Sequence, residues 1–110
     1  MTLEHARKFA LSLPETSEQP HFEATSFRVC GKIFATVPAG ATHLHIFVDE
    51  DQRAPLIAAA PAVFEALLWG AKCVGVRVLL AKADGASVKR LLLEGWTRKA
   101  PKRLAAQRTA

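Results

Sequence analysis

Two histidines, His43 and His45, stand two residues apart in a run where polar and apolar residues alternate. In a β-strand this spacing places both imidazoles on one face, and imidazole nitrogens are common zinc ligands. The other two histidines, His5 and His21, do not stand at a spacing that presets a third ligand. Because zinc sites use three or four protein ligands, the sequence favours a histidine pair without a metal over a metal centre.

The side chains that could act as nucleophiles lack the sequence context that activates them. Cys30 has no evident His or Asn partner, and the glycines match neither a phosphate-binding loop nor a dinucleotide fingerprint. No serine lies in a nucleophile elbow, which excludes that role for Ser12, Ser17, Ser26 and Ser87. We therefore expect no enzyme, no catalytic residue, no cofactor and no small-molecule substrate.

The positive charges are concentrated in the second part of the chain. Residues 1–67 carry five Lys/Arg against eight carboxylates, whereas residues 68–110 carry ten against two, giving net charges of −3 and +8. Such a surplus favours an anionic partner, because clustered cations release condensed counterions when they neutralise phosphates. DNA is the expected partner. A membrane is not expected, since no apolar run reaches the roughly 20 residues that a span requires.

Candidate phosphate contacts fall in three places. The first two are predicted hairpin regions, and the third is the basic C-terminal segment; the residues are Arg28, Lys32, Lys72, Arg77, Arg98, Lys99, Lys102 and Arg103. Phosphate contacts position a protein on DNA and do not read its sequence, and the chain has no Asn and only three Gln for adenine contacts. The alternative interpretation is that these cations are solvated surface residues.

Three aromatic residues suggest a second kind of function. Phe34 and Phe47 alternate with the apolar residues expected to face the core, so they are predicted on the uncovered side of the sheet. Trp69 opens a loop bounded by glycines, where it either packs across the sheet or binds a ligand. Together they form a possible apolar surface for a protein partner or a second copy, as in a chaperone-like module.

The elements that must position these residues follow from the hydrophobic periodicity. Apolar residues recur at helical spacing over residues 2–13, and residues 15–21 form a polar connector. Strands are expected over residues 24–30 and 33–37, joined by a turn at Gly31 and Lys32, and over residues 43–48. A short helix over residues 49–60 follows, with acidic residues at its start.

The remaining pattern completes an α+β fold. Residues 63–68 read as a strand, although a helical turn fits nearly as well, and residues 76–80 read as a strand. A final amphipathic helix starts at Asp84 and ends before Pro101. The order α-β-β-β-α-β-β-α predicts a two-layer sandwich, with an antiparallel five-stranded sheet and helices on one face.

The length of 110 residues predicts a single domain, which we place at residues 1–104, followed by a basic tail at residues 105–110. Charged residues occupy the region where a signal peptide would be apolar, so a cytoplasmic location is expected. Cys30 and Cys73 are far apart in sequence and are expected to be two reduced thiols.

Several segments resemble the MmcQ/YjbR family. They are residues 27–36 (FRVCGKIFAT), the Trp69-Gly70 pair, residues 75–78 (GVRV), Trp96, and residues 100–102 (APK), within a resemblance that extends from Leu13 to Leu104. The resemblance implies a bacterial protein with a two-layer, secretion-chaperone-like domain. It also implies DNA binding through a double-wing arrangement of hairpins, a function that is assigned to the family by fold analogy.

Overall fold

The first helix, α1 (Leu3–Ser12), is set by its cap and its apolar stripe. In the computed structural model, which describes the backbone of residues 1–109 and the side chains of residues 1–106, the Thr2 side chain accepts a hydrogen bond from the His5 N–H. The helix buries Ala6 and Ala10 and ends at Ser12, with Leu13 as its C-cap immediately before Pro14. The helix predicted over residues 2–13 is therefore confirmed.

The polar segment after α1 is a strand, β1 (Thr16–His21), where the sequence predicted a connector. It pairs antiparallel with β2 (Ala24–Val29), from Thr16 opposite Val29 to His21 opposite Ala24. Most of its side chains are exposed because it is an edge strand. Backbone pairing rather than side-chain burial makes it a strand, so the sheet has six strands instead of the five expected.

The next strands follow the predicted pattern. β2 and β3 (Lys32–Val37) form a hairpin whose two-residue turn is Cys30 and Gly31, both with positive φ, and β4 (His43–Ile46) follows. Then come α2 (Glu50–Ala59), β5 (Phe64–Trp69), β6 (Lys72–Leu79) and the short 3₁₀ turn η1 (Leu80–Lys82). The segment that fitted either a strand or a helical turn is thus the strand β5.

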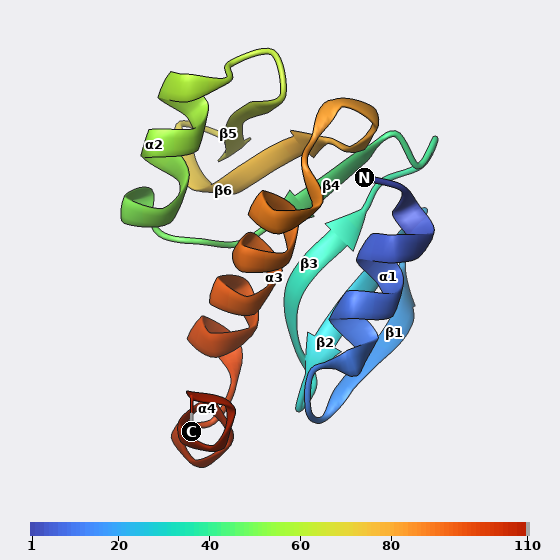
Figure 1. Ribbon diagram of the computed structural model, residues 1–110. Helices are drawn as coiled ribbons and strands as arrows, with labels where there is room; N and C mark the ends of the chain where they lie inside the picture. The colour runs from blue at the N-terminus through green and yellow to red at the C-terminus, as the bar shows by residue number, and fades with distance from the viewer. Residues whose placement is uncertain (110) are drawn as a thin grey trace.

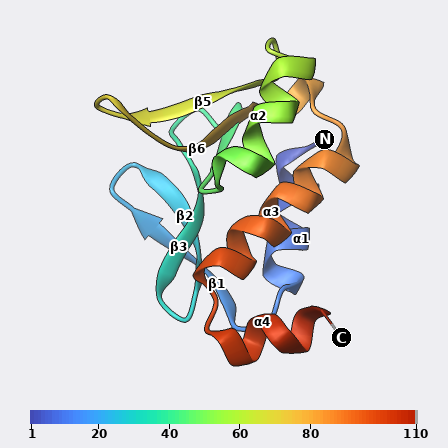
Figure 2. The same ribbon diagram turned by 90° about the vertical axis from the view of Figure 1, so that its left-hand side faces the viewer.

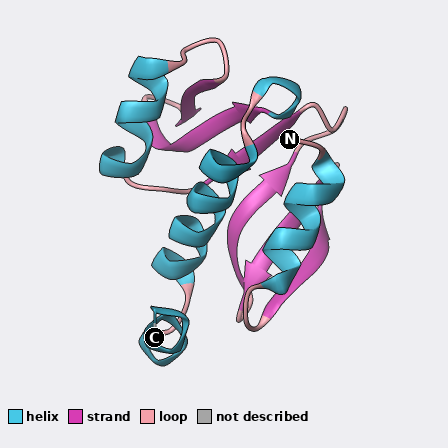
Figure 3. Ribbon diagram, in the orientation of Figure 1, coloured by secondary structure: helices cyan, strands magenta, loops and turns pink. Residues whose placement is uncertain are grey.

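The six strands form one antiparallel sheet in the order β1-β2-β3-β4-β6-β5. Helices α1, α2 and α3 (Gly85–Lys99) lie on one side of it, as Figures 1 and 3 show from the helix side. In Figure 2 the helices lie to the right, and the β1–β2 and β5–β6 hairpins project to the left. The predicted α+β class, the antiparallel sheet and the helices on one face are confirmed.

The centre of the sheet is its most weakly paired part. Strands β3 and β4 share only two register pairs, Ala35 with Ile46 and Thr36 with His45, and one further hydrogen bond from the Phe47 N–H to the Phe34 carbonyl. Beyond these pairs the chain after β4 leaves the sheet and leads into α2. We call this part of the sheet the central junction.

Helix α3 supplies much of the core. The Asp84 side chain caps it by accepting from the Ser87 N–H, and its buried face carries Val88, Leu91, Leu92 and Trp96. After Pro101, α4 (Lys102–Thr109) buries Leu104. The expected basic tail therefore starts within a helix; the side chains of residues 107–110 and the backbone of Ala110 lie outside the described residues. Among the described residues, the helices are too short or too polar to cross a membrane.

Candidate functional site

A groove of about 840 Å³ is lined by residues of β3, β4, β5 and β6 together with the start of α2 and the end of α3. The groove runs between the β1–β2 hairpin, which contributes His21, and the β5–β6 hairpin, which contributes Trp69 and Lys72. Both hairpins project from the same side of the molecule in Figure 2. This volume falls within the roughly 300–1,000 Å³ that is typical of small-ligand sites. We refer to it as the outer groove.

A tight turn places Trp69 and Lys72 at the groove. The segment from Trp69 to Val74, predicted as a loop, is mostly strand: Trp69 ends β5, Lys72 begins β6, and the two residues pair across the hairpin. Only Gly70 and Ala71 form the turn, and Gly70 has a φ of 62°, a conformation that glycine adopts without strain. The hairpin therefore holds an aromatic ring and a cation side by side.

Two aromatic side chains lie together in the outer groove. Trp69 is 66% exposed and half-buried Phe47 meets it edge to face, with ring centroids 5.6 Å apart. Phe47 lies outside the fully buried core, as predicted, and Trp69 packs against Phe47 while most of its surface stays exposed. An exposed aromatic ring beside a second ring is a suitable surface for stacking.

The prediction for Phe34 was wrong. Its side chain is fully buried in the core. In the β2–β3 hairpin, Phe27 pairs with Ala35 but the next residue, Arg28, pairs with Ile33, so Phe34 is an extra residue on β3. This bulge reverses the alternation of the strand: Phe34 joins Ala35 in the core, and Ile33 lines the outer groove instead.

Five cations and two carboxylates line the outer groove, a surplus of three positive charges. Lys32, Lys72 and Lys99 have no ion pair with any residue that the structure describes. Lys32 and Lys72 are exposed and Lys99 is half-buried. These lysines come from the β2–β3 hairpin, the β5–β6 hairpin and the end of α3. The fold therefore brings together residues from each of the three segments that were predicted to contact phosphate.

The two arginines at the groove already have partners. Arg98 Nε lies 3.2 Å from Asp49 Oδ1, and Arg53 donates from Nη1 to the Val48 carbonyl at 2.7 Å. Arg98 was predicted as a phosphate contact, whereas Arg53, like His21, was missed. Arg53 lies on α2 and reaches the groove because of the path of the chain between β4 and α2. No local sequence pattern predicts this path.

Four predicted contact residues do not line the groove. Arg77 lies on the outer sheet face, where Nη1 is 2.5 Å from Glu65 Oε1, so its charge is largely compensated. Arg28 donates from Nε to Ser26 Oγ at 3.0 Å. Lys102 and Arg103 are exposed on α4. Arg28 and Arg77 therefore take part in polar contacts on the surface of the sheet. Lys102 and Arg103 extend the positively charged surface beyond α3.

His45 lies in the outer groove, in a cross-strand row between Thr36 and Arg77. Its Nε2 is buried and has no hydrogen-bond partner among the described residues, whereas Nδ1 of His43 is 2.8 Å from Thr42 Oγ1. No group of three or more His, Cys, Asp or Glu side chains within the described part of the chain could hold a metal ion. Cys30 and Cys73 are both free thiols, as expected.

Comparisons with known proteins identify the family. The chain matches the YjbR family over residues 11–98. It belongs to the YjbR family. Among solved structures, Deinococcus radiodurans protein DR2400, which carries a DUF419 domain, is similar with a TM-score of 0.75 and 22% sequence identity, over 88% of this chain and 77% of that chain. At this identity the likeness supports the fold alone. No curated protein matches the chain.

The match to the YjbR family includes most of the outer groove. Lys32, Phe47, Trp69 and Lys72 all fall within residues 11–98, as does Arg98 at its end. Lys99 lies one residue beyond the match, and Lys102 and Arg103 lie further on. The groove is therefore built almost wholly from the family's domain, whereas α4 and its basic residues follow that domain.

In this YjbR-family protein, stability is expected to fall in mild acid because of His45. Burial lowers the pKa of His45 from its ordinary value of 6.5, and the positive charges of Arg77 and His43 lower it further against the opposing effect of Glu65. The unfolded state therefore protonates His45 more readily than the folded state does. The contribution of neutral His45 to the unfolding free energy is present above pH 6.5 and is lost as the pH falls below that value.

Urea unfolding at about pH 7.5 and about pH 5.5 tests this expectation. The wild type should lose more unfolding free energy between the two conditions than a His45→Gln variant. The matched control, His5→Gln, changes an exposed histidine on α1 and should keep the wild-type pH dependence. Equal losses in wild type and His45→Gln would contradict the assignment.

Proposed function

We propose that this chain is a nucleic-acid-binding module that acts without catalysis, with DNA as its partner and the cytoplasm as its location. The observation that carries the proposal is the convergence of Lys32, Lys72 and Lys99 on the outer groove from three segments of the chain. These lysines are free of ion pairs with described residues. Unpaired cations gathered on one surface attract a polyanion and release its counterions on binding.

The proposed mode of binding is contact with phosphates rather than reading of bases. Lysine acts as a compact, mobile point charge and suits phosphate contacts that do not depend on sequence. Lys102 and Arg103 follow Lys99 by three and four residues and are exposed, so they add contacts at the α3 side of the groove. Arg28 and Arg77 have smaller roles in this proposal, because each already holds a polar partner on the sheet.

Neutralising the three lysines is expected to weaken binding and its dependence on salt. A Lys32→Gln/Lys72→Gln/Lys99→Gln variant should bind a labelled DNA oligonucleotide more weakly at every salt concentration. The slope of log affinity against log salt should shrink by about 2 to 3, since each lysine–phosphate contact contributes roughly one. Fluorescence anisotropy titrations at several salt concentrations, with single-stranded and duplex forms of one sequence, measure both quantities.

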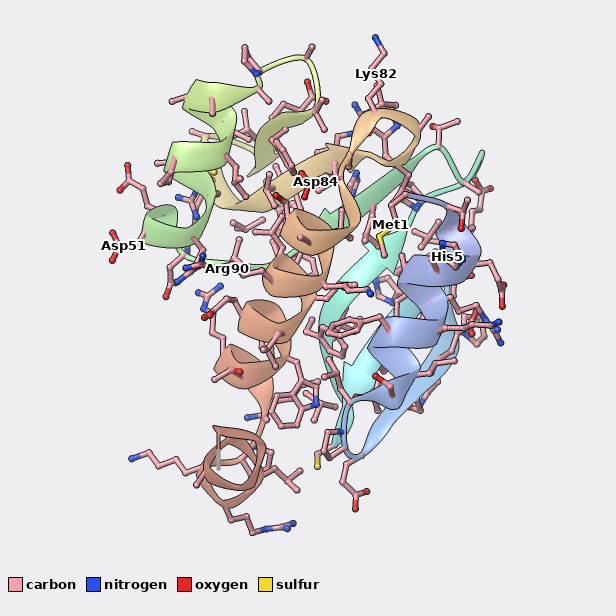
Figure 4. The ribbon with its side chains drawn as sticks, viewed as in Figure 1. Met1, His5, Asp51, Lys82, Asp84 and Arg90 are labelled. Atoms are coloured by element: carbon pink, nitrogen blue, oxygen red, sulfur yellow. The ribbon has the colours of Figure 1, made fainter. Side chains whose placement is uncertain are left out.

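A matched control removes the same number of cations elsewhere. Lys8, Lys82 and Arg90 are exposed and do not line the outer groove. In Figure 4, Lys82 projects from the end of the molecule and Arg90 belongs to the helix layer. The Lys8→Gln/Lys82→Gln/Arg90→Gln variant should keep most of the affinity and of the salt slope. Failure of the wild type to bind either form of DNA at low salt would overturn the proposed function.

A second candidate is a protein-interaction or chaperone-like module, and the edge strand β5 favours it. Leu68 and Trp69 of this strand are 57% and 66% exposed, and its outer backbone edge is unpaired within the described sheet. An exposed apolar edge strand can add a strand from a peptide or a second copy. The burial of Phe34 removes one residue from this surface. A salt-insensitive homodimer or peptide complex, measured by sedimentation, distinguishes this candidate from DNA binding.

A further inference from the structure

The outer groove combines a pair of aromatic rings with a set of unpaired cations. Each of these features binds a different kind of ligand when it occurs alone. Its interior holds the Phe47–Trp69 ring pair and the apolar side chains of Ile33 and Leu67. The unpaired lysines Lys32, Lys72 and Lys99 line the same hollow. Aromatic rings within a cationic groove are the arrangement that binds single-stranded nucleic acid, because the rings stack on bases while the cations follow the backbone.

The exposed ring of Trp69 is better suited to an unpaired base than to an undistorted duplex. In undistorted double-stranded DNA each base face is covered by its neighbours, and a protein surface reaches phosphates and base edges. Stacking on an aromatic side chain requires an unpaired base that can leave its neighbours. Trp69 is two-thirds exposed and lies directly across the hairpin from Lys72, so a base on the ring brings its phosphate near the ammonium group.

The size and composition of the groove agree with this ligand. A hollow of about 840 Å³ accommodates a ligand of drug size, which is the size class of a nucleotide, whereas a duplex is too wide to enter it and contacts only the exposed lysines at its rim. The chain has no Asn, and the groove contains no Gln, so the bidentate amide contacts that identify adenine are not available there. Stacking is tolerant of sequence because every base has a π-face.

We propose that the outer groove binds single-stranded nucleic acid, with bases stacked on Trp69 beside Phe47 and phosphates held by Lys32, Lys72 and Lys99. This inference rests on the proposed nucleic-acid function and adds the strandedness of the partner. Affinity for a single strand exceeds that for the duplex of the same sequence. Stacking on Trp69 accounts for the difference, and the lysines contribute to both forms.

Trp69→Ala is the variant that tests the inference. It should lower the affinity for a labelled oligothymidine of about 15 nucleotides by about tenfold, while leaving the affinity for the corresponding duplex nearly unchanged. Trp69→Phe keeps a stacking surface and should recover part of the loss. The matched control, Phe22→Ala, removes an aromatic side chain that is 95% exposed at the tip of the β1–β2 hairpin and does not line the groove. Its affinity should equal that of the wild type.

Intrinsic fluorescence supplies an independent readout. The chain has two tryptophans, of which Trp69 is exposed and Trp96 is fully buried. Unlabelled oligothymidine should quench the fluorescence of the wild type, and Trp69→Phe should abolish this quenching. Equal affinity for the two forms, with Trp69→Ala binding as the wild type does, overturns the inference and leaves the proposed function standing. Absence of binding to both forms overturns the two together.

Discussion

The Trp96→Ala variant is expected to lose about 3–5 kcal/mol of unfolding free energy, the usual cost of truncating a buried tryptophan. Trp96 is fully buried on α3, and its indole Nε1 donates to the Pro14 carbonyl at 3.0 Å. It thereby joins α3 to the turn between α1 and β1. Since domains of this size have unfolding free energies of about 5–15 kcal/mol, the loss removes a large share of the total.

Urea unfolding followed by circular dichroism measures this loss as a lower midpoint. Trp96→Phe serves as the matched variant, because it keeps an aromatic ring in the core and loses the indole hydrogen bond. Its destabilisation should be clearly smaller than that of Trp96→Ala. A loss below about 1 kcal/mol for Trp96→Ala would mean that this side chain contributes little to the packing of α3.

Gly75→Ala is the second substitution with a large expected effect. A Cβ atom at Gly75 would lie 2.1 Å from the Ile46 carbonyl oxygen and 3.0 Å from the Phe47 Cα. Both are backbone atoms, so relief requires β4 and β6 to move apart where they pair. We expect destabilisation at or above the upper end of the roughly 1–3 kcal/mol that overpacking costs. Displacement of Phe47 would also disturb its contact with Trp69.

Gly85→Ala is the control for this prediction. Among the described residues, a Cβ at Gly85, the first residue of α3, would have only the Met1 side chain within reach, at 4.0 Å. Alanine is a better helix residue than glycine, so this variant should unfold at the same urea concentration as the wild type or a higher one. A Gly75→Ala protein as stable as Gly85→Ala would show that β4 and β6 do not approach each other so closely.

Hydrophobic periodicity was sufficient to predict most of the fold. The spacing of apolar residues in α1 and α3, and the alternation in β2, β4 and β6, identified these elements and the core residues on them. It failed for β1, whose exposed side chains leave no apolar pattern. It also failed for Phe34, because a single extra residue reverses the alternation without changing the composition of the strand.

The candidate site was predictable only in part, since a groove depends on contacts between distant segments. Charge and turn patterns singled out Lys32, Lys72 and Lys99, and the glycine turn singled out Trp69. The pairing of Arg77 with Glu65 depends on the register between β5 and β6, which the sequence does not specify. Arg53 enters the groove through the path of the chain after β4, so only the tertiary structure shows it.

The central junction divides the sheet into two three-stranded ribbons that carry opposite walls of the outer groove. Lys32 belongs to one ribbon, and Trp69 and Lys72 belong to the other. Helix α3 crosses the joint closely, because a Cβ at Gly95 would lie 3.0 Å from Ile46 Cγ2 and 3.3 Å from the Phe34 carbonyl oxygen. Because β3 and β4 share fewer register pairs than any other neighbouring strands of the described sheet, widening the groove here would break the fewest backbone contacts.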